Sequence, residues 1–131
     1  MTIYADIQRA LYAKLTADST LRAAVYDEVP AQTQFPYIVL GETTALPFDS
    51  HNREGLELTH TLHVWSRYRG YLEVYNIFAR LHQSLHNATL ELDNSGFVAC
   101  RIEFTDVLRD PDGTRHGVMR LRLWANETKS P

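Results

Sequence analysis

Apolar and polar residues alternate between positions 56 and 64, and this alternation constrains the fold more than any other feature of the chain. In an extended chain Leu56, Leu58, Leu62 and Val64 fall on one face, and Glu57, Thr59, Thr61 and His63 fall on the other. Such a strand buries one face against a core and exposes the other to solvent. The pattern returns near the C-terminus, where Met119, Leu121 and Leu123 share the face opposite Val118, Arg120, Arg122 and Trp124. The chain is therefore predicted to build a sheet with one buried and one open face.

Two segments have helical spacing instead. Apolar residues recur three or four positions apart between Ile3 and Leu15, and again between Tyr71 and Leu85. A short helix is predicted at residues 18–24. In the last of these helices the predicted buried stripe consists of Tyr71, Val74, Tyr75, Phe78, Leu81, His82 and Leu85.

Turn signals separate the strands. Residues 46–55 form a predicted polar loop, and Asp110-Pro111-Asp112-Gly113 is a strong turn because proline presets φ and glycine tolerates a positive φ. Between them, an alternating segment places Val98, Cys100, Ile102 and Phe104 on the core face of another strand.

The order of these segments predicts an α+β fold in a single domain. It lacks the regular alternation of a doubly wound fold, so we expect an antiparallel sheet with two main helices packed on one face. The domain is predicted to span residues 1–125, and residues 126–131 form a polar tail.

Composition excludes several classes of protein. With 131 residues and a net charge of −3, the chain lacks the basic excess of a general nucleic-acid binder. Its one cysteine, Cys100, has no partner for an internal disulfide, which suits a reducing cytoplasm. No secretory signal and no membrane span are predicted, because no apolar run approaches the required ~20 residues.

The residues that carry chemistry in other proteins occur here without a catalytic pattern. His82 and His86 lie four positions apart, but Gln83 stands where a zinc protease needs a glutamate. His60 and His63 fall on opposite faces of one strand, and His60, on the apolar face, is predicted to be buried, neutral and hydrogen-bonded. Cys100 is predicted to be a buried, inert thiol. Asp110 and Asp112 begin no calcium loop, since the later ligands are missing. No enzymatic activity, metal or cofactor is predicted.

Trp65 and Trp124 are predicted on the open face of the sheet, as are arginines of the C-terminal hairpin, among them Arg101, Arg120 and Arg122. The tryptophans either form a protein interface or close the rim of the core. The arginines either cover a solvated face, contact a protein, or, as the weakest reading, contact phosphates. Further interface candidates lie in the predicted loop: Phe48, Asp49, His51, Arg53 and Glu54.

Five motifs in order resemble the phage tail-completion family, whose members are also called tail terminators or head–tail joining proteins and have relatives in gene transfer agents. The resemblance covers nearly the whole chain. The motifs are Leu15-Thr16-Ala17-Asp18, Val25-Tyr26-Asp27-Glu28-Val29-Pro30, Phe35-Pro36-Tyr37, Val64-Trp65-Ser66-Arg67 before Gly70, and Arg109-Asp110-Pro111-Asp112-Gly113 through His116-Gly117.

The resemblance implies a structural protein that forms a ring, typically a hexamer, at the head-proximal end of a long tail tube in the virion or particle. It implies assembly in the host bacterial cytoplasm, a tail tube protein and a head connector, adaptor or stopper protein as partners, and DNA passing through the ring without sequence-specific binding. Acidic residues lining the lumen would repel DNA phosphates. The candidates are Asp49, Glu54, Glu57 and Asp93.

Two alternatives stay open at this point. Another ring-forming tail or connector subunit fits the same resemblance, and a tube subunit differs in that it polymerises by itself. A small cytoplasmic enzyme or ligand-binding domain would need polar groups converging in a pocket, and the sequence offers no such set.

Overall fold

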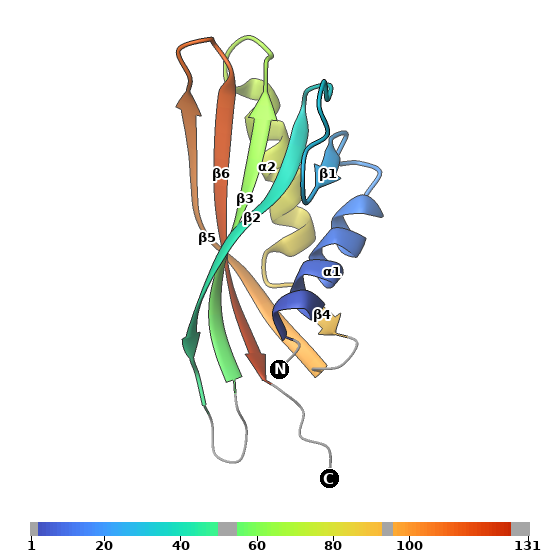
Figure 1. The fold of residues 1–131 in the computed structure, drawn as a ribbon, viewed down its shortest axis with the longest axis vertical. Helices are drawn as coiled ribbons and strands as arrows, with labels where there is room; N and C mark the ends of the chain where they lie inside the picture. Colours follow the sequence, from blue (N-terminus) through green and yellow to red (C-terminus); the bar gives the residue numbers. More distant parts are fainter. Residues whose placement is uncertain (1–2, 50–54, 93–95, 127–131) are drawn as a thin grey trace.

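Two helices and six strands make up the part of the chain that the computed structural model describes, residues 3–49, 55–92 and 96–126 (Figure 1). They are α1 (Ile3–Thr16), β1 (Ala24–Tyr26), β2 (Tyr37–Pro47), β3 (Gly55–Ser66), α2 (Leu72–Leu85), β4 (Thr89–Leu92), β5 (Gly96–Arg109) and β6 (Arg115–Asn126). The predicted α+β class is confirmed. Neither helix in these ranges is long and apolar enough to cross a membrane.

The six strands form one curled sheet in the order β1-β2-β3-β6-β5-β4. The prediction of an antiparallel sheet holds for four of the strand pairs and is wrong for β1 and β2, which run parallel. The sheet is therefore mixed. The cause lies before β2, where the predicted helix at residues 18–24 does not form. Asp18 instead accepts hydrogen bonds from the N–H and hydroxyl of Thr20, and Arg22 has a φ of 55°, so the chain turns and enters β1.

The centre of the sheet is the pairing of β3 with β6. It runs without interruption from Gly55 opposite Asn126 to Ser66 opposite Arg115. The apolar residues predicted for the core face are buried on both strands, among them Leu58, Leu62, Leu121 and Leu123. Full burial of one such side chain contributes about 1.5–3 kcal/mol.

The two helices pack differently, so the prediction that both lie on one face is confirmed only in part. α2 contacts β3, β5 and β6, whereas α1 contacts β1 and β4, the strands at the two edges of the sheet. Because the sheet curls, these edges approach the same helix (Figure 1). The buried residues of α1 include Ile3, Ile7, Leu11 and Leu15, which are the predicted apolar positions.

The predicted stripe of α2 was wrong in part. Its buried residues are Val74, Ile77, Leu81 and Leu85, while Tyr71, Tyr75 and His82 are exposed. The buried face of the helix is thus rotated away from the predicted stripe, so that Tyr71 and Tyr75 face outwards and Ile77 faces the core. This rotation leaves an aromatic surface on the outer side of α2.

Two β-bulges shift side chains from the core face to the open face. One lies in β2 between Leu40 and Thr43, and the other in β5 between Ile102 and Phe104. A single extra residue reverses the alternation of the rest of the strand. Regular alternation predicts Phe104 in the core. The extra residue in β5 turns it to the open face, where it pairs with Arg120 and is 43% exposed.

Gly117 sets how closely α2 approaches the sheet. A Cβ atom at this position would lie 2.7 Å from Val74 Cγ1 and 2.9 Å from Phe78 Cζ. We predict that Gly117→Ala lowers the free energy of unfolding by about 1–3 kcal/mol through overpacking, measured by chemical denaturation. The double variant Gly117→Ala/Val74→Ala lacks the contacting methyl group. Its loss of unfolding free energy should therefore be smaller than the sum of the losses of the two single variants. Fully additive costs would show that this contact does not cause the loss.

Candidate interaction surface

The sheet face away from the helices, here called the open face, carries five of the ten residues predicted for an interface. Both tryptophans lie on it, as predicted: Trp65 pairs with His116, and Trp124 pairs with Glu57. Each is half-buried. The open face is defined by Glu42 on β2, Glu57, Thr59, Thr61, His63 and Trp65 on β3, His116, Arg120, Arg122 and Trp124 on β6, and Arg101, Glu103 and Phe104 on β5.

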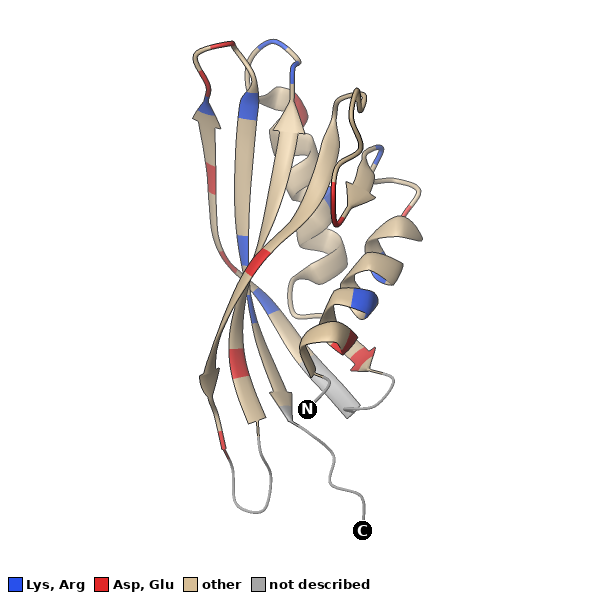
Figure 2. Cartoon of the chain, in the orientation of Figure 1, with Lys and Arg blue, Asp and Glu red and all other residues tan. Residues whose placement is uncertain are grey.

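The arginines of the open face are not equivalent. Arg122 forms ion pairs with Glu57 at 2.9 Å and with Glu103, so its charge is offset by carboxylates of two neighbouring strands. Arg120 lies over the ring of Phe104, 4.9 Å from its centroid. Figure 2 shows acidic and basic residues mixed along the sheet and no stripe of one sign. This mixture suits contact with a protein better than contact with a phosphate backbone.

Two shallow grooves follow these side chains. One of about 530 Å³ lies between Glu42, Thr59 and Thr61 on one side and Phe104 and Arg120 on the other. The second, of about 250 Å³, contains Trp124 with Arg101 and Arg122. Both are open and mixed in polarity, which suits side chains of a partner rather than an enclosed small molecule.

A row of four side chains crosses the open face and was missed by sequence reasoning. Trp65 stacks on His116 with ring centroids 3.9 Å apart and an interplanar angle of 7°. His116 Nε2 lies 2.7 Å from His63 Nδ1, and His63 Nε2 lies 3.2 Å from a carboxylate oxygen of Glu42. If His63 donates to Glu42 from Nε2, its neutral ring accepts at Nδ1, and His116 is then the donor. The row depends on the register of β3 with β6 and on the β2 bulge, neither of which the sequence displays.

Burial, hydrogen bonds and neighbouring charge shift the pKa values of His116, Glu42 and His60. Desolvation, together with the His63 charge, lowers the pKa of His116. Burial acts to raise the pKa of Glu42, but hydrogen bonds to its own backbone, His63 and Thr61 and the His63 charge lower it overall. On the core face, desolvation lowers the pKa of His60 to about 4. The predicted hydrogen-bonded, neutral His60 is confirmed, since its Nδ1 lies 2.6 Å from the Thr43 hydroxyl.

Of the other predicted interface and lumen residues, the structure describes Phe48 and Asp49, which follow β2 directly. Phe48 is exposed just after β2, and Asp49 Oδ1 accepts a hydrogen bond from the Gly55 N–H at 3.3 Å. The predicted loop is shorter than residues 46–55, because β2 continues to Pro47 and β3 starts at Gly55. His51, Arg53, Glu54 and Asp93 fall outside the described residues.

The other side chains that could carry chemistry are buried or hold the fold together. Cys100 is buried, and burial raises the pKa of its thiol to about 12. His82 and His86 stack with centroids 4.4 Å apart, and His86 Nδ1 accepts the N–H of Ile102. Thr114 donates its N–H to Asp112, which holds the predicted turn. Across the described ranges, no three His, Cys, Asp or Glu side chains are placed to hold a metal ion.

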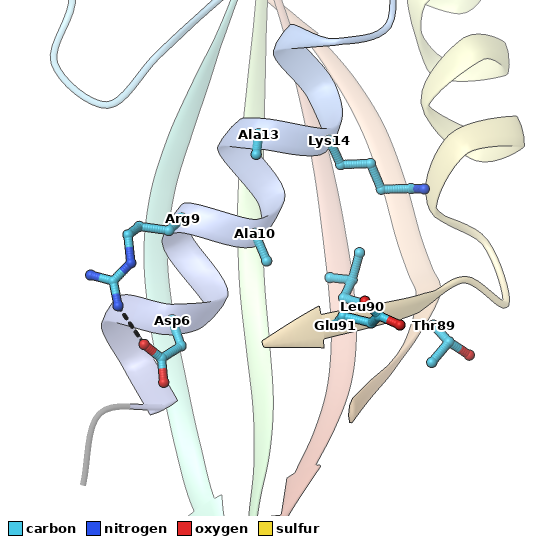
Figure 3. Close-up of a pocket in the computed structure, with 8 residues that line it drawn as sticks. All are labelled: Asp6, Arg9, Ala10, Ala13, Lys14, Thr89, Leu90 and Glu91. Atoms are coloured by element: carbon cyan, nitrogen blue, oxygen red, sulfur yellow. Dashed lines mark hydrogen bonds and ion pairs between the residues drawn. The ribbon is translucent and has the colours of Figure 1, made fainter. Parts of the chain in front are cut away.

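A further groove of about 450 Å³ lies between α1 and β4 (Figure 3). Asp6 and Arg9 form an ion pair on its α1 side, and Glu91 lies on its β4 side. These groups lack a nucleophile with an adjacent base. The groove therefore offers no catalytic arrangement.

Comparison with known proteins points to one family. The sequence matches the family described as tail completion protein gp17 over residues 9–126. It is 30% identical over 93 residues to the tail completion protein gp17 of Bacillus phage SPP1, which covers 70% of this chain and 69% of that protein. A chain of the virion of a native gene transfer agent particle shares the fold, with a TM-score of 0.86, 22% identity, and coverage of 94% of this chain and 96% of that one. A second solved structure has a TM-score of 0.60 at 13% identity, with coverage of 98% and 96%.

The buried histidines predict a stability that depends on pH. The folded-state pKa of His60 is about 4 against 6.5 in the unfolded chain, and the pKa of His116 is lowered too, so the unfolded state binds more protons in acid. Through His60, the free energy of unfolding is therefore highest above pH 6.5 and falls as the pH drops towards 4. The total fall is about 3 kcal/mol. Denaturation of His60→Leu across this range should show a correspondingly weaker loss.

The matched variant Thr43→Val keeps the buried imidazole and should keep the pH dependence, because desolvation is the largest cause of the shift. If the unfolding free energies of the wild type and His60→Leu depended on pH in the same way, His60 would not be the cause of the loss in acid.

Proposed function

The chain belongs to the tail completion protein gp17 family, and we propose that it caps the head-proximal end of a long tail tube, stops the elongation of that tube and joins it to the head connector. It is a structural phage-type tail protein and not an enzyme. The observation that carries this proposal is the family match, which extends over residues 9–126. A tail completion protein has to bind the last tube subunits without offering them a surface on which the tube continues.

Free strand edges support an assembly role. Within the described residues, β1 covers β2 only from Tyr37 to Val39, so the rest of β2 pairs on one side alone. β4 covers β5 only as far as Ala99, and contacts with Ala88 and His86 satisfy the N–H groups of Cys100 and Ile102. Residues 103–109 of β5 follow as an uncovered edge. Such edges accept a strand from a neighbouring protein.

We propose that copies of the chain form a closed ring, a hexamer, in the particle. A heterologous contact that closes on itself produces a ring, and a stable contact of this kind buries roughly 800 Å² per partner. The open face and the two edges offer contact surface to ring neighbours, the tail tube protein and the head connector or stopper. The particle position follows from these partners: the head-proximal end of the tail, after assembly in the bacterial cytoplasm.

The lumen is proposed to be acidic, so that DNA passes without sticking. Asp49 is exposed in the single copy, so its carboxylate is available to the lumen unless a neighbouring copy engages it. Glu57 suits it less well, because its ion pair with Arg122 offsets its charge. Glu54 and Asp93 complete the proposed set from sequence alone. A ring whose bore is lined by arginines would contradict this part of the proposal.

Deletion of the gene from its phage or transfer-agent cluster tests the function. We predict filled heads beside detached, abnormally long tails in negative-stain electron micrographs of the lysate, because nothing would then stop the tube. Complementation with the intact gene should restore joined particles. Heads without any tube would favour a tube subunit instead, and normal joined particles would refute the proposal.

The open face can be tested with a single substitution. Trp124→Ala removes a half-buried aromatic anchor and should reduce joined particles at least tenfold, since aromatic residues dominate interface energies. Tyr12→Ala is the matched control, because Tyr12 is an exposed aromatic on α1. Circular dichroism should show both variants folded. Equal particle yields from the two folded variants would exclude Trp124 from the interface.

A further inference from the structure

A groove at the N-terminal end of α2, here called the α2 groove, has the features of a protein-docking site. It has a volume of about 290 Å³ and is lined by Arg22, Pro36, Tyr68, Leu72, Ile77 and Arg80. Ile77 is buried and forms the apolar floor. The groove lies near the lower end of the size range of ligand pockets, so it suits one or two side chains of a partner.

The apolar wall of the α2 groove is exposed to an unusual degree. Tyr68 is 59% exposed and Leu72 is 62% exposed, and Tyr75 follows one turn later on the same helix. Tyr71 and Tyr75 stack with centroids 6.0 Å apart, and Arg115 lies over Tyr71. These two rings stand beside the groove, whose own apolar wall consists of Tyr68 and Leu72.

The charge of the α2 groove is positive. No ion pair engages Arg22 or Arg80 within the described part of the chain. The carboxylate of Glu73 also lines the groove, but it accepts a hydrogen bond of 2.6 Å from the Ser66 hydroxyl. The site therefore fits an apolar side chain that is followed by a carboxylate.

The same molecule presents such a segment at its other end. Leu46 is 66% exposed and Phe48 is 48% exposed, and Asp49 follows directly. Phe48 donates its N–H to the Gly55 carbonyl at 2.9 Å, and Asp49 accepts the Gly55 N–H, so both are anchored to the start of β3. These residues form the end of the β2–β3 hairpin.

The groove and the hairpin end cannot meet within one molecule. Pro36 in the groove and Pro47 before the hairpin end lie at the two ends of β2, which spans 11 residues or roughly 33 Å (Figure 1). We propose that Phe48 and Asp49 of one copy dock in the α2 groove of a second copy, with the ring against Tyr68 and Leu72 and the carboxylate beside Arg22 and Arg80. This contact rests on the proposed ring and assigns one of its subunit interfaces.

A contact between different surfaces of identical copies has a defined consequence. In the proposed ring it is heterologous, because each copy gives Phe48 and Asp49 to one neighbour and its groove to the other, and such contacts close into a ring or continue as a filament. Few large side chains take part, which makes a single contact weak, whereas closure raises the effective concentration of the last contact. Assembly should therefore depend steeply on protein concentration or on a partner that gathers the copies.

Disulfide trapping tests the contact directly. In the double variant Phe48→Cys/Leu72→Cys, the two new thiols of one chain are too far apart to pair, so only neighbouring copies can be linked. Oxidation should yield a ladder of covalent multimers on a denaturing gel. The natural Cys100 does not interfere, because it is buried and its thiol pKa is raised to about 12. Tyr12→Cys/Leu72→Cys serves as the control and should give at least tenfold less multimer.

Exchange of the two charges tests the proposed pairing of Asp49 with Arg80 by the same trapping assay. Arg80→Glu and Asp49→Arg should each reduce trapping at least tenfold in the double-cysteine background, and their combination should restore it. Lys14→Glu, an exposed charge change on α1, should have no effect. Failure of the combined variant to restore trapping would overturn the pairing of Asp49 with this groove.

Trapping is measured both on the purified protein and on assembled particles, because some assembly proteins associate only beside their partners. Absence of the ladder in both samples overturns the contact. The proposed function fails by a different observation, namely normal joined particles after gene deletion. A ladder together with normal particles after gene deletion would support the contact and refute the proposed function. Long detached tails after gene deletion, without a ladder, would support the function and refute the contact.

Discussion

The pairing of β3 with β6 is the interaction on which the rest of the structure depends. Its unbroken register places Leu58 beside Leu123 and Leu62 beside Met119 on the core face, and places Trp65 beside His116 on the open face. A slip of one residue would exchange the two faces along both strands. The apolar row receives α2, which approaches so closely that a Cβ atom at Gly117 would overlap with Val74 and Phe78. One pairing thus sets both the core and the surface proposed for assembly.

The two bulges bring charged and aromatic side chains together on the open face. An extra residue in β2 brings Glu42 to His63, and an extra residue in β5 brings Glu103 to Arg122 and Phe104 to Arg120. Without them, Phe104 would remain in the core, where the alternation of β5 predicts it. The chemistry of the open face therefore comes from local departures in two strands flanking a regular central pair.

The molecule is also asymmetric along β2. The exposed aromatic and arginine residues lie where α2 begins, while Phe48 and Asp49 lie at the far end of the β2–β3 hairpin (Figure 1). Different surfaces at the two ends favour contacts that run in one direction around an assembly. The open face takes no part in the proposed contact between copies, and its mixed charge fits a protein partner better than DNA.

The sequence by itself determined the α+β class, the two main helices, the two faces of β3 and β6, and the buried states of His60 and Cys100, because these depend on local periodicity and on burial. Its family motifs also indicated the tail-completion family. Only the tertiary structure decided the parallel pairing of β1, the rotation of α2 that exposes Tyr71 and Tyr75, and the bulge that exposes Phe104. It also brought together Glu42, His63 and His116, which are far apart in the chain. Strand register, bulge position and helix rotation are set by packing between distant segments, and a local pattern in the sequence carries no information about those contacts.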